Sequence, residues 1–139
     1  MAALVDTNIL VYRYDPRSPE KQKAATNLLR KGLAEDSIRV AHQSIVEFVA
    51  VMQRLSASAA IMTVDQARWE AESLLDQFPI LYPNEDLLRT ALRGAAAYQL
   101  SWFDAHLWAY AETFGLDVIY SEDFQHGRFY GGVRTLRTV

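Results

Sequence analysis

The sequence predicts a small α/β domain with a mostly parallel central sheet, and three observations support this. Short apolar segments typical of strands alternate with longer amphipathic segments typical of helices, which is the pattern of α/β folds. The length of 139 residues suits a single domain. Hydrophobic residues make up 50% of the chain and charged residues 22%, as in an ordinary globular protein. We therefore expect one domain over residues 1–139, without linkers or repeats.

The first third of the chain predicts two strands and two helices. A buried strand at 4–6 ends in a carboxylate, and a helix begins at about residue 8. Two prolines within 15–19 indicate a turn, with Ser18 and Pro19 suited to the start of a helix that runs to about Leu33. A second short strand follows at 38–41.

The middle of the chain predicts two helices and a strand. A helix dense in apolar residues covers 43–55, and small residues at 56–60 interrupt the pattern. Thr63 is a suitable N-cap for a helix at 64–78. The segment 79–83 is a strand with a proline at each end, which favours an edge position or a short segment.

The last third predicts two helices and two strands. Asn84 caps a helix that runs to about Tyr98, and a further helix covers 103–114, with Gly115 just after it. Strands are expected at 118–120 and, after a glycine turn, at 133–136.

Composition and charge limit the function. Cysteine is absent, which fits a reducing compartment and excludes zinc sites built on thiolates. The chain begins without a basic segment, and no apolar stretch approaches the length of a bilayer span, so we expect a cytoplasmic protein that does not bind membranes. The net charge of −3 argues against a broad basic surface. Any contact with nucleic acid must then be local or depend on metal ions.

Four carboxylates occur in apolar surroundings, where an ionised group is costly without a compensating cation. They are Asp6, Glu47, Asp104 and Asp123. Asp6 and Asp123 lie at or just past the ends of predicted strands, where open α/β sheets bind their ligands. Glu47 and Asp104 lie near the starts of predicted helices. Several carboxylates without a nearby lysine form a site for a hard cation, and Mg²⁺ or Mn²⁺ prefers oxygen ligands.

Each of these residues also has a plainer explanation. Asp6 and Asp104 could simply cap helices, and the last of the four could be an ordinary polar loop residue. Glu47 could form a buried ion pair with an arginine such as Arg54 or Arg93. Their joint placement is the reason to prefer the metal site.

Four segments together resemble one known family. They are Leu4-Val5-Asp6-Thr7-Asn8-Ile9-Leu10, Ser44-Ile45-Val46-Glu47-Phe48, Ser101-Trp102-Phe103-Asp104-Ala105 and Tyr120-Ser121-Glu122-Asp123-Phe124-Gln125-His126-Gly127. The chain resembles the PIN-domain family and, within it, the VapC-type toxins of prokaryotic toxin–antitoxin pairs. The resemblance extends over essentially the whole chain, in order.

The resemblance implies an α/β/α sandwich and an endoribonuclease that depends on Mg²⁺ or Mn²⁺. It implies a homodimer and a cognate antitoxin that inhibits the nuclease. It also implies the residues of the site. The catalytic and metal-binding acids would be Asp6, Glu47, Asp104 and Asp123, and the supporting residues would be Thr7, Asn8, Ser121 and Glu122. We favour Asp123 over its neighbour as the acid that points inward, with Asp6 and Asp104 as direct ligands.

A modest run of basic residues in the first predicted helical region could bind RNA phosphates. Its members are Arg13, Arg17, Lys21 and Lys23. Such a run is usually a solvated helix face, and that alternative remains open.

Three other functions compete with a toxin nuclease. A phosphoaspartyl enzyme is disfavoured, because Asn8 stands where a second aspartate is expected and all three lysines lie in one early helix. A metal-free, PIN-like module that binds RNA or protein would be indicated by the loss of an acid, and all four are present. A PIN-like nuclease of RNA processing without an antitoxin also remains possible.

Overall fold

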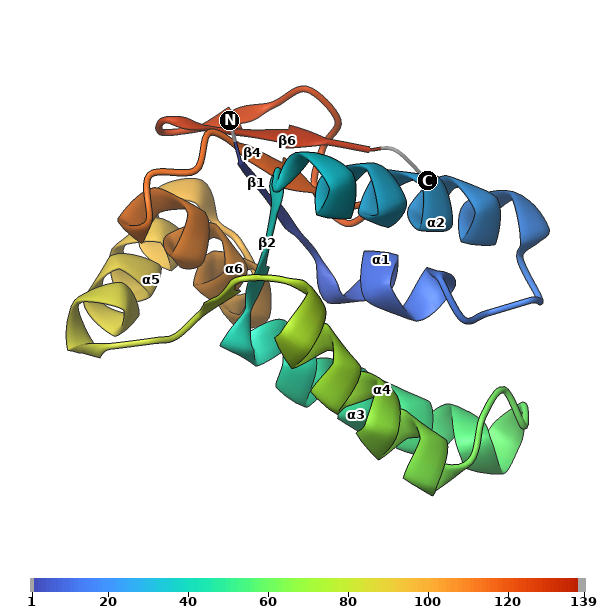
Figure 1. Cartoon of the computed structure of the whole chain (residues 1–139). Coiled ribbons are helices and arrows are strands. Elements are labelled where there is room, and N and C mark those ends of the chain that lie inside the picture. Colours follow the sequence, from blue (N-terminus) through green and yellow to red (C-terminus); the bar gives the residue numbers. More distant parts are fainter. Residues whose placement is uncertain (1, 138–139) are drawn as a thin grey trace.

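Six strands form a single sheet in the computed structural model, which describes residues 2–137 (Figure 1). The strand order is β3-β2-β1-β4-β6-β5. All neighbouring strands are parallel except β5 and β6, which are antiparallel. The strands are β1 (Ala3–Val5), β2 (Ile38–Ala41), β3 (Ile80–Leu81), β4 (Val118–Tyr120), β5 (Phe129–Tyr130) and β6 (Val133–Leu136).

Helices cover both faces of this sheet, so the predicted α/β fold with a mostly parallel sheet is confirmed (Figure 1). Helices α1 to α4 pack on one face, and α5 and α6 pack on the other. The helices are α1 (Thr7–Tyr12), α2 (Pro19–Glu35), α3 (His42–Ser58), α4 (Val64–Gln77), α5 (Glu85–Tyr98) and α6 (Trp102–Thr113). None of the described helices combines the length and apolarity that crossing a bilayer requires.

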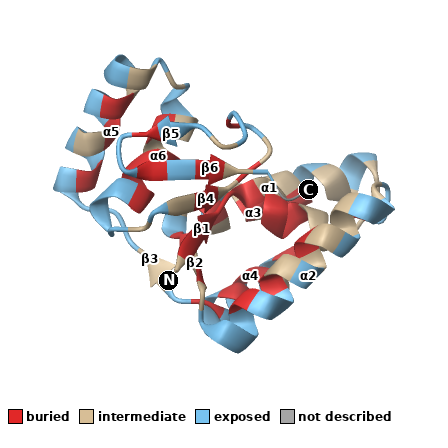
Figure 2. Cartoon of the chain, turned by 90° about the horizontal axis from the view of Figure 1, so that it is seen from above, coloured by how far each residue is buried: buried red, intermediate tan, exposed pale blue. Residues whose placement is uncertain are grey.

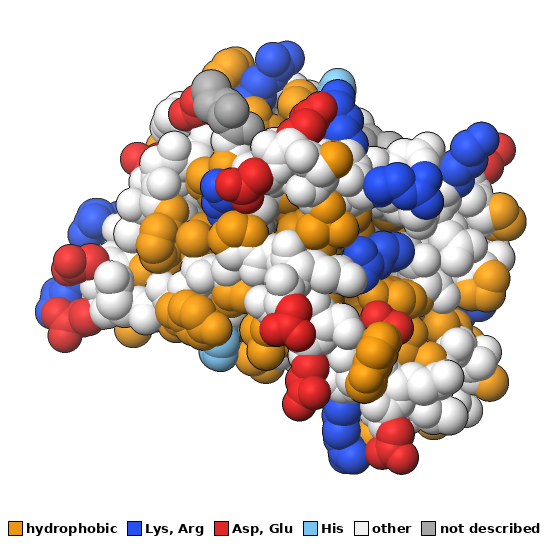
Figure 3. All heavy atoms as spheres, in the orientation of Figure 1, with side chains coloured by type: hydrophobic (Ala, Val, Ile, Leu, Met, Phe, Trp, Pro, Cys, Tyr) orange, Lys and Arg blue, Asp and Glu red, His pale blue; other side chains and the backbone are white. Residues whose placement is uncertain are grey.

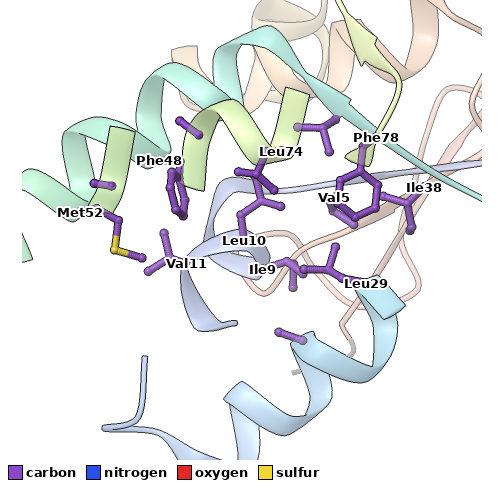
Figure 4. Close-up of a cluster of buried hydrophobic side chains, with 14 residues drawn as sticks. Val5, Ile9, Leu10, Val11, Leu29, Ile38, Phe48, Met52, Leu74 and Phe78 are labelled. Atoms are coloured by element: carbon purple, nitrogen blue, oxygen red, sulfur yellow. The ribbon is translucent and has the colours of Figure 1, made fainter. Parts of the chain in front are cut away.

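The alternation of side chains along the strands divides the core into two clusters. On β1, Val5 faces the helices α1 to α4, whereas Leu4 faces α5 and α6. Figure 4 shows the first cluster, to which β1 contributes Val5, α1 contributes Leu10 and α3 contributes Phe48. Figure 2 shows the same division, with buried residues on the sheet and on the inner sides of the helices. Burial on both faces fixes β1 in the middle of the sheet.

Several boundaries differ from the sequence-based prediction. The strand β5 is not predicted at all, because two residues carry no periodicity and the strand exists through its pairing with β6. Helix α3 continues through most of the predicted break at 56–60, since small residues do not by themselves end a helix. The cap of α6 is Ser101, whose hydroxyl accepts a hydrogen bond from the backbone N–H of Asp104 at 3.2 Å. Asp104 is therefore not the N-cap of its helix.

The close packing of α5 on α6 depends on a glycine. A Cβ at Gly94 would lie only 2.3 Å from a ring carbon of Trp108, and the Trp108 indole is held by a 2.9 Å hydrogen bond from its Nε1 to the carbonyl oxygen of Tyr130. We expect Gly94→Ala to lower the free energy of unfolding by about 1–3 kcal/mol through overpacking. Urea denaturation measures this.

The control is Ala96→Gly, at an exposed position of the same helix. Helix propensity alone predicts that alanine is the better residue by about 1 kcal/mol at such a site. A Gly94→Ala variant more stable than the wild type by about 1 kcal/mol would show that the indole moves aside without cost.

Candidate active site

Asp6 and Ser121 meet where two central strands end. Asp6 directly follows β1, and its backbone N–H donates a 2.9 Å hydrogen bond to the carbonyl oxygen of Tyr120, the last residue of β4. The Ser121 hydroxyl donates to Asp6 Oδ2 at 2.6 Å, and the Thr7 backbone N–H donates to Oδ1 at 2.6 Å. Asp6 is thus the N-cap of α1, which was the alternative to a metal-binding role, and it also lies at the carboxyl end of the sheet.

The loop after β4 brings Asp123 to the same place. The Ser121 hydroxyl oxygen accepts a 3.1 Å hydrogen bond from the backbone N–H of Asp123, so one serine contacts both aspartates. The side-chain amide of Asn8 donates to Asp123 Oδ2 at 3.3 Å. Strand order explains the meeting, because β1 and β4 are neighbours although Asp6 and Asp123 lie far apart in the chain.

Glu47 enters from α3 and is held by two side chains. Thr7 Oγ1 donates to Glu47 Oε2 at 3.1 Å, and Gln43 Nε2 donates to Oε1 at 2.6 Å. Gln43 Nε2 also lies 3.2 Å from the carbonyl oxygen of Phe103, which connects α3 to the start of α6, where Asp104 is found. Neither Arg54 nor Arg93 pairs with Glu47 among the described residues.

All four predicted acids line one cavity of about 330 Å³. Its walls also include Gln43, Arg54 and Phe103. A second cavity of about 320 Å³ shares Asp6, Glu47 and Asp123 with the first. The structure therefore gathers Asp6, Glu47, Asp104 and Asp123 at one opening at the carboxyl end of the sheet.

The charge of this cluster is poorly compensated. Burial raises the pKa of Asp6 to about 7 and outweighs the opposing hydrogen bond from Ser121, and the charges of Asp123 and Asp104 raise it further. The pKa of Asp123 is raised for the same reasons, burial first and then the charge of Asp104. Within residues 2–137, none of the four acids has a Lys, Arg or His partner at ion-pair distance. A cation would relieve this repulsion.

The chemistry of the donors fits a hard divalent cation, because the cluster offers carboxylate oxygens without sulfur or imidazole. The carboxylate of Asp6, whose residue is only 8% exposed, is held at a pKa far above its usual value, as expected of a group that needs a positive partner. In the described part of the chain, no group of three His, Cys, Asp or Glu side chains is positioned to hold one metal ion.

Glu122 is turned away from this cluster. Its carboxylate accepts hydrogen bonds from the Tyr12 hydroxyl and, at 2.9 Å, from Lys21 Nζ. Glu122 lines neither of the two cavities that contain Asp6. The other residues expected to support the site, Thr7, Asn8 and Ser121, all contact one of the four acids.

The basic run splits up in the folded chain. Lys21 pairs with Glu122, and Arg13 Nη2 donates to Gln77 Oε1 at 3.2 Å. Figure 3 shows Lys and Arg side chains gathered over α2, which carries Lys21 and Lys23, at the right of that view. Of the four residues, only Arg17 lines a cavity that contains Asp6.

Three polar or aromatic residues of the first cavity were not predicted from the sequence as part of the site. Gln43 and Arg54 lie one turn before and two turns after Glu47 on α3, so helical spacing would have placed them on the same face. Phe103 and Trp102, at the start of α6, are both exposed, Phe103 to 68%. An aromatic residue next to a helix cap gives no signal of which way it points.

Residues 3–131 match the PIN domain family, and the chain belongs to that family. Its members are typically nucleases that depend on metal. No curated protein has a sequence that matches this chain significantly.

The fold is similar to those of several solved toxin–antitoxin structures. The DNA-bound VapBC of Salmonella typhimurium has a TM-score of 0.75 at 10% identity, covering 100% of this chain and 99% of that one. A toxin–antitoxin complex from Klebsiella pneumoniae has a TM-score of 0.68 at 18% identity, covering 95% of both. VapC20 of Mycobacterium tuberculosis, described as a toxin that cleaves the sarcin–ricin loop, has a TM-score of 0.63 at 15% identity, covering 96% and 99%.

Proposed function

We propose that this protein is a metal-dependent endoribonuclease and the toxin of a toxin–antitoxin pair. The observation that carries the proposal is the meeting of four carboxylates, without an ion-pair partner among residues 2–137, in one cavity at the carboxyl end of the sheet. Such a cluster repels a phosphodiester unless a cation lies between them. A nucleic-acid substrate and a metal requirement therefore go together here.

We assign the four acids two roles. Asp6 and Asp104 would hold Mg²⁺ or Mn²⁺ directly, and Glu47 and Asp123 would act through water, complete a second metal site or orient the attacking water. A divalent ion bound there lowers the pKa of water and neutralises the phosphate oxygens. Ser121 and Thr7 keep the carboxylates of Asp6 and Glu47 in place through the hydrogen bonds described above.

Membership of the PIN family and the solved relatives support the choice of RNA and of a toxin. Among the structural relatives, VapC20 is described as cleaving the sarcin–ricin loop, and others are crystallised as toxin–antitoxin complexes. We extend these properties to this chain as an RNA substrate and a cognate antitoxin. We also propose a homodimeric, cytoplasmic protein, as the resemblance to VapC-type toxins implies. Sedimentation equilibrium tests the dimer, and a mass of one chain at all concentrations would contradict it.

The experiment that tests the proposal is cleavage of total cellular RNA and of single-stranded oligoribonucleotides by the purified protein. We expect cleavage with Mg²⁺ or Mn²⁺, no cleavage with EDTA, and recovery when metal is restored. The mapped ends should lie within the RNA, as an endonuclease requires. Metal-independent cleavage, or no cleavage of any RNA by protein that binds metal, would refute the proposed activity.

A further inference from the structure

The two cavities that contain the acids are adjacent, and we treat them as the two arms of one groove. They share Asp6, Glu47, Val51 and Asp123, so they flank the acidic cluster. The first arm continues to Arg54 and Phe103, and the second continues to Arg17. Among the residues that line these cavities, each arm therefore contains one arginine, with the acids between them.

Arg17 is held in the second arm by a nearly buried acid. Asp15 is 4% exposed, and its two carboxylate oxygens accept hydrogen bonds from Arg17 Nε at 3.0 Å and from Nη2 at 2.9 Å. The backbone N–H of Arg17 also donates to Asp15 Oδ1 at 3.0 Å. A guanidinium carries five N–H donors, so this fork leaves the Nη1 side able to bind an anion. The Arg17 side chain is 54% exposed.

Arg54 provides the cation of the first arm. It is exposed, lines the cavity with the acids, and forms no ion pair within the described residues. Phe103 lines the same arm, and its exposed ring offers a surface on which an unpaired base can stack. The first arm thus combines a cation for a phosphate with an aromatic ring for a base.

An RNA strand that passes over the acidic cluster carries phosphates on both sides of the one that is cut. Those flanking phosphates are repelled by the acids and gain most from a cation at a short distance along the groove. Base stacking on Phe103 requires a base that is not paired in a duplex. The arrangement of the groove therefore suits a single strand better than a helix.

We propose that a single RNA strand lies along this groove, with one flanking phosphate bound by Arg17, another bound by Arg54, and a base stacked on Phe103. Asp15 is a positioning residue that fixes Arg17. The inference rests on the proposed ribonuclease function, but it concerns binding on either side of the cut rather than the cut itself.

The test is the salt dependence of RNA binding, measured by fluorescence anisotropy with a labelled 12-nucleotide oligouridine in Ca²⁺. Loss of one phosphate contact on a single strand changes the slope of log K against log salt by about 0.7. We expect Arg17→Ala and Arg54→Ala each to make the slope shallower by about this amount and to weaken binding about tenfold. Arg17→Lys should keep the slope but still weaken binding, because lysine lacks the planar fork.

The controls match each arginine in its surroundings. Arg89→Ala removes an exposed arginine that pairs with Glu85, and Arg30→Ala removes an exposed arginine of α2. Neither lines the groove, and neither should change the slope by 0.7. Phe103→Ala should weaken binding to the single strand about tenfold without changing the slope, and should leave the weaker binding to a duplex of the same length unchanged.

Each result either supports or overturns the inference, separately from the cleavage reaction. Unchanged slopes in either arginine variant, or no binding of oligouridine by the wild type, would overturn it. If the wild type cleaves RNA in Mg²⁺ while the slopes stay unchanged, the proposed function stands and this inference fails. If the slopes change but no RNA is cleaved, the groove binds RNA and the proposed activity fails.

Discussion

Replacing Asp6 by asparagine should lower the rate of RNA cleavage by about three orders of magnitude or more. The carboxylate is fixed by Ser121 and by the Thr7 backbone N–H, so the amide would occupy the same place without the charge that holds a cation. Asp104→Asn should have a similar effect. Single-turnover cleavage of an oligoribonucleotide at saturating Mg²⁺ measures both losses.

Two further variants distinguish the loss of the Asp6 charge from other effects on the cleavage rate. Ser121→Ala removes a hydrogen bond to Asp6 but no charge, and should cost about 10- to 100-fold, in the range of residues that orient metal ligands. Glu112→Gln removes an exposed acid of α6 that lines neither cavity and should have no effect. If Asp6→Asn retained near-normal cleavage, Asp6 would not be the acid on which catalysis depends.

The second large effect concerns stability without metal. Because burial raises the pKa of Asp6 to about 7 in the folded protein, the folded state keeps a proton that the unfolded chain releases near pH 4. The free energy of unfolding should therefore fall as the pH rises from about 4 to 7, by on the order of 4 kcal/mol, and then level off. Urea denaturation in EDTA across this range measures the slope.

The other shifted acids affect this curve in known directions. Asp123, whose pKa is also raised, adds to the loss as the pH rises. The pKa values of Asp15 and Glu122 are lowered by their hydrogen-bond partners, so both acids stabilise the folded state at neutral pH. This stabilisation is lost only as the pH falls through their lowered pKa values. Asp6→Asn should flatten most of the fall between pH 4 and 7.

A control variant and the addition of Mg²⁺ complete the test of pH-dependent stability. Asp36→Asn, at an exposed side chain, should leave the pH curve unchanged. Mg²⁺ should stabilise the wild type more at pH 8 than at pH 5, because the ion competes with the proton for the same carboxylates. A metal-free stability that rises between pH 4 and 7 would mean that Asp6 is ionised at little cost.

The acids of the site could be predicted from the sequence, but their partners only in part. A carboxylate at the end of an apolar strand is conspicuous, and strand ends meet at one edge of a parallel sheet, which is enough to place Asp6 and Asp123 together. That the acid before Asp123 points elsewhere is decided by Tyr12 and Lys21, which come from distant elements. Periodicity contains no information about such contacts.

The same limit applies to the arginines. Arg13, Arg17, Lys21 and Lys23 look alike as a run of charge, yet only Arg17 reaches the groove, because Asp15 holds it there. Arg54 was considered only as a partner of Glu47. Its place in the first cavity depends on how α3 packs against the start of α6, which a single sequence does not reveal.

The pairing of β1 with β4 determines when the acidic cluster can form during synthesis of the chain. The backbone N–H of Asp6 and its carboxylate find their partners at Tyr120 and Ser121, more than 110 residues later in the chain. A nascent chain that has not yet released this segment from the ribosome has the first acid but neither its backbone partner nor Asp123. The acidic cluster that the proposed activity requires therefore forms only after residues 120–123 have left the ribosome.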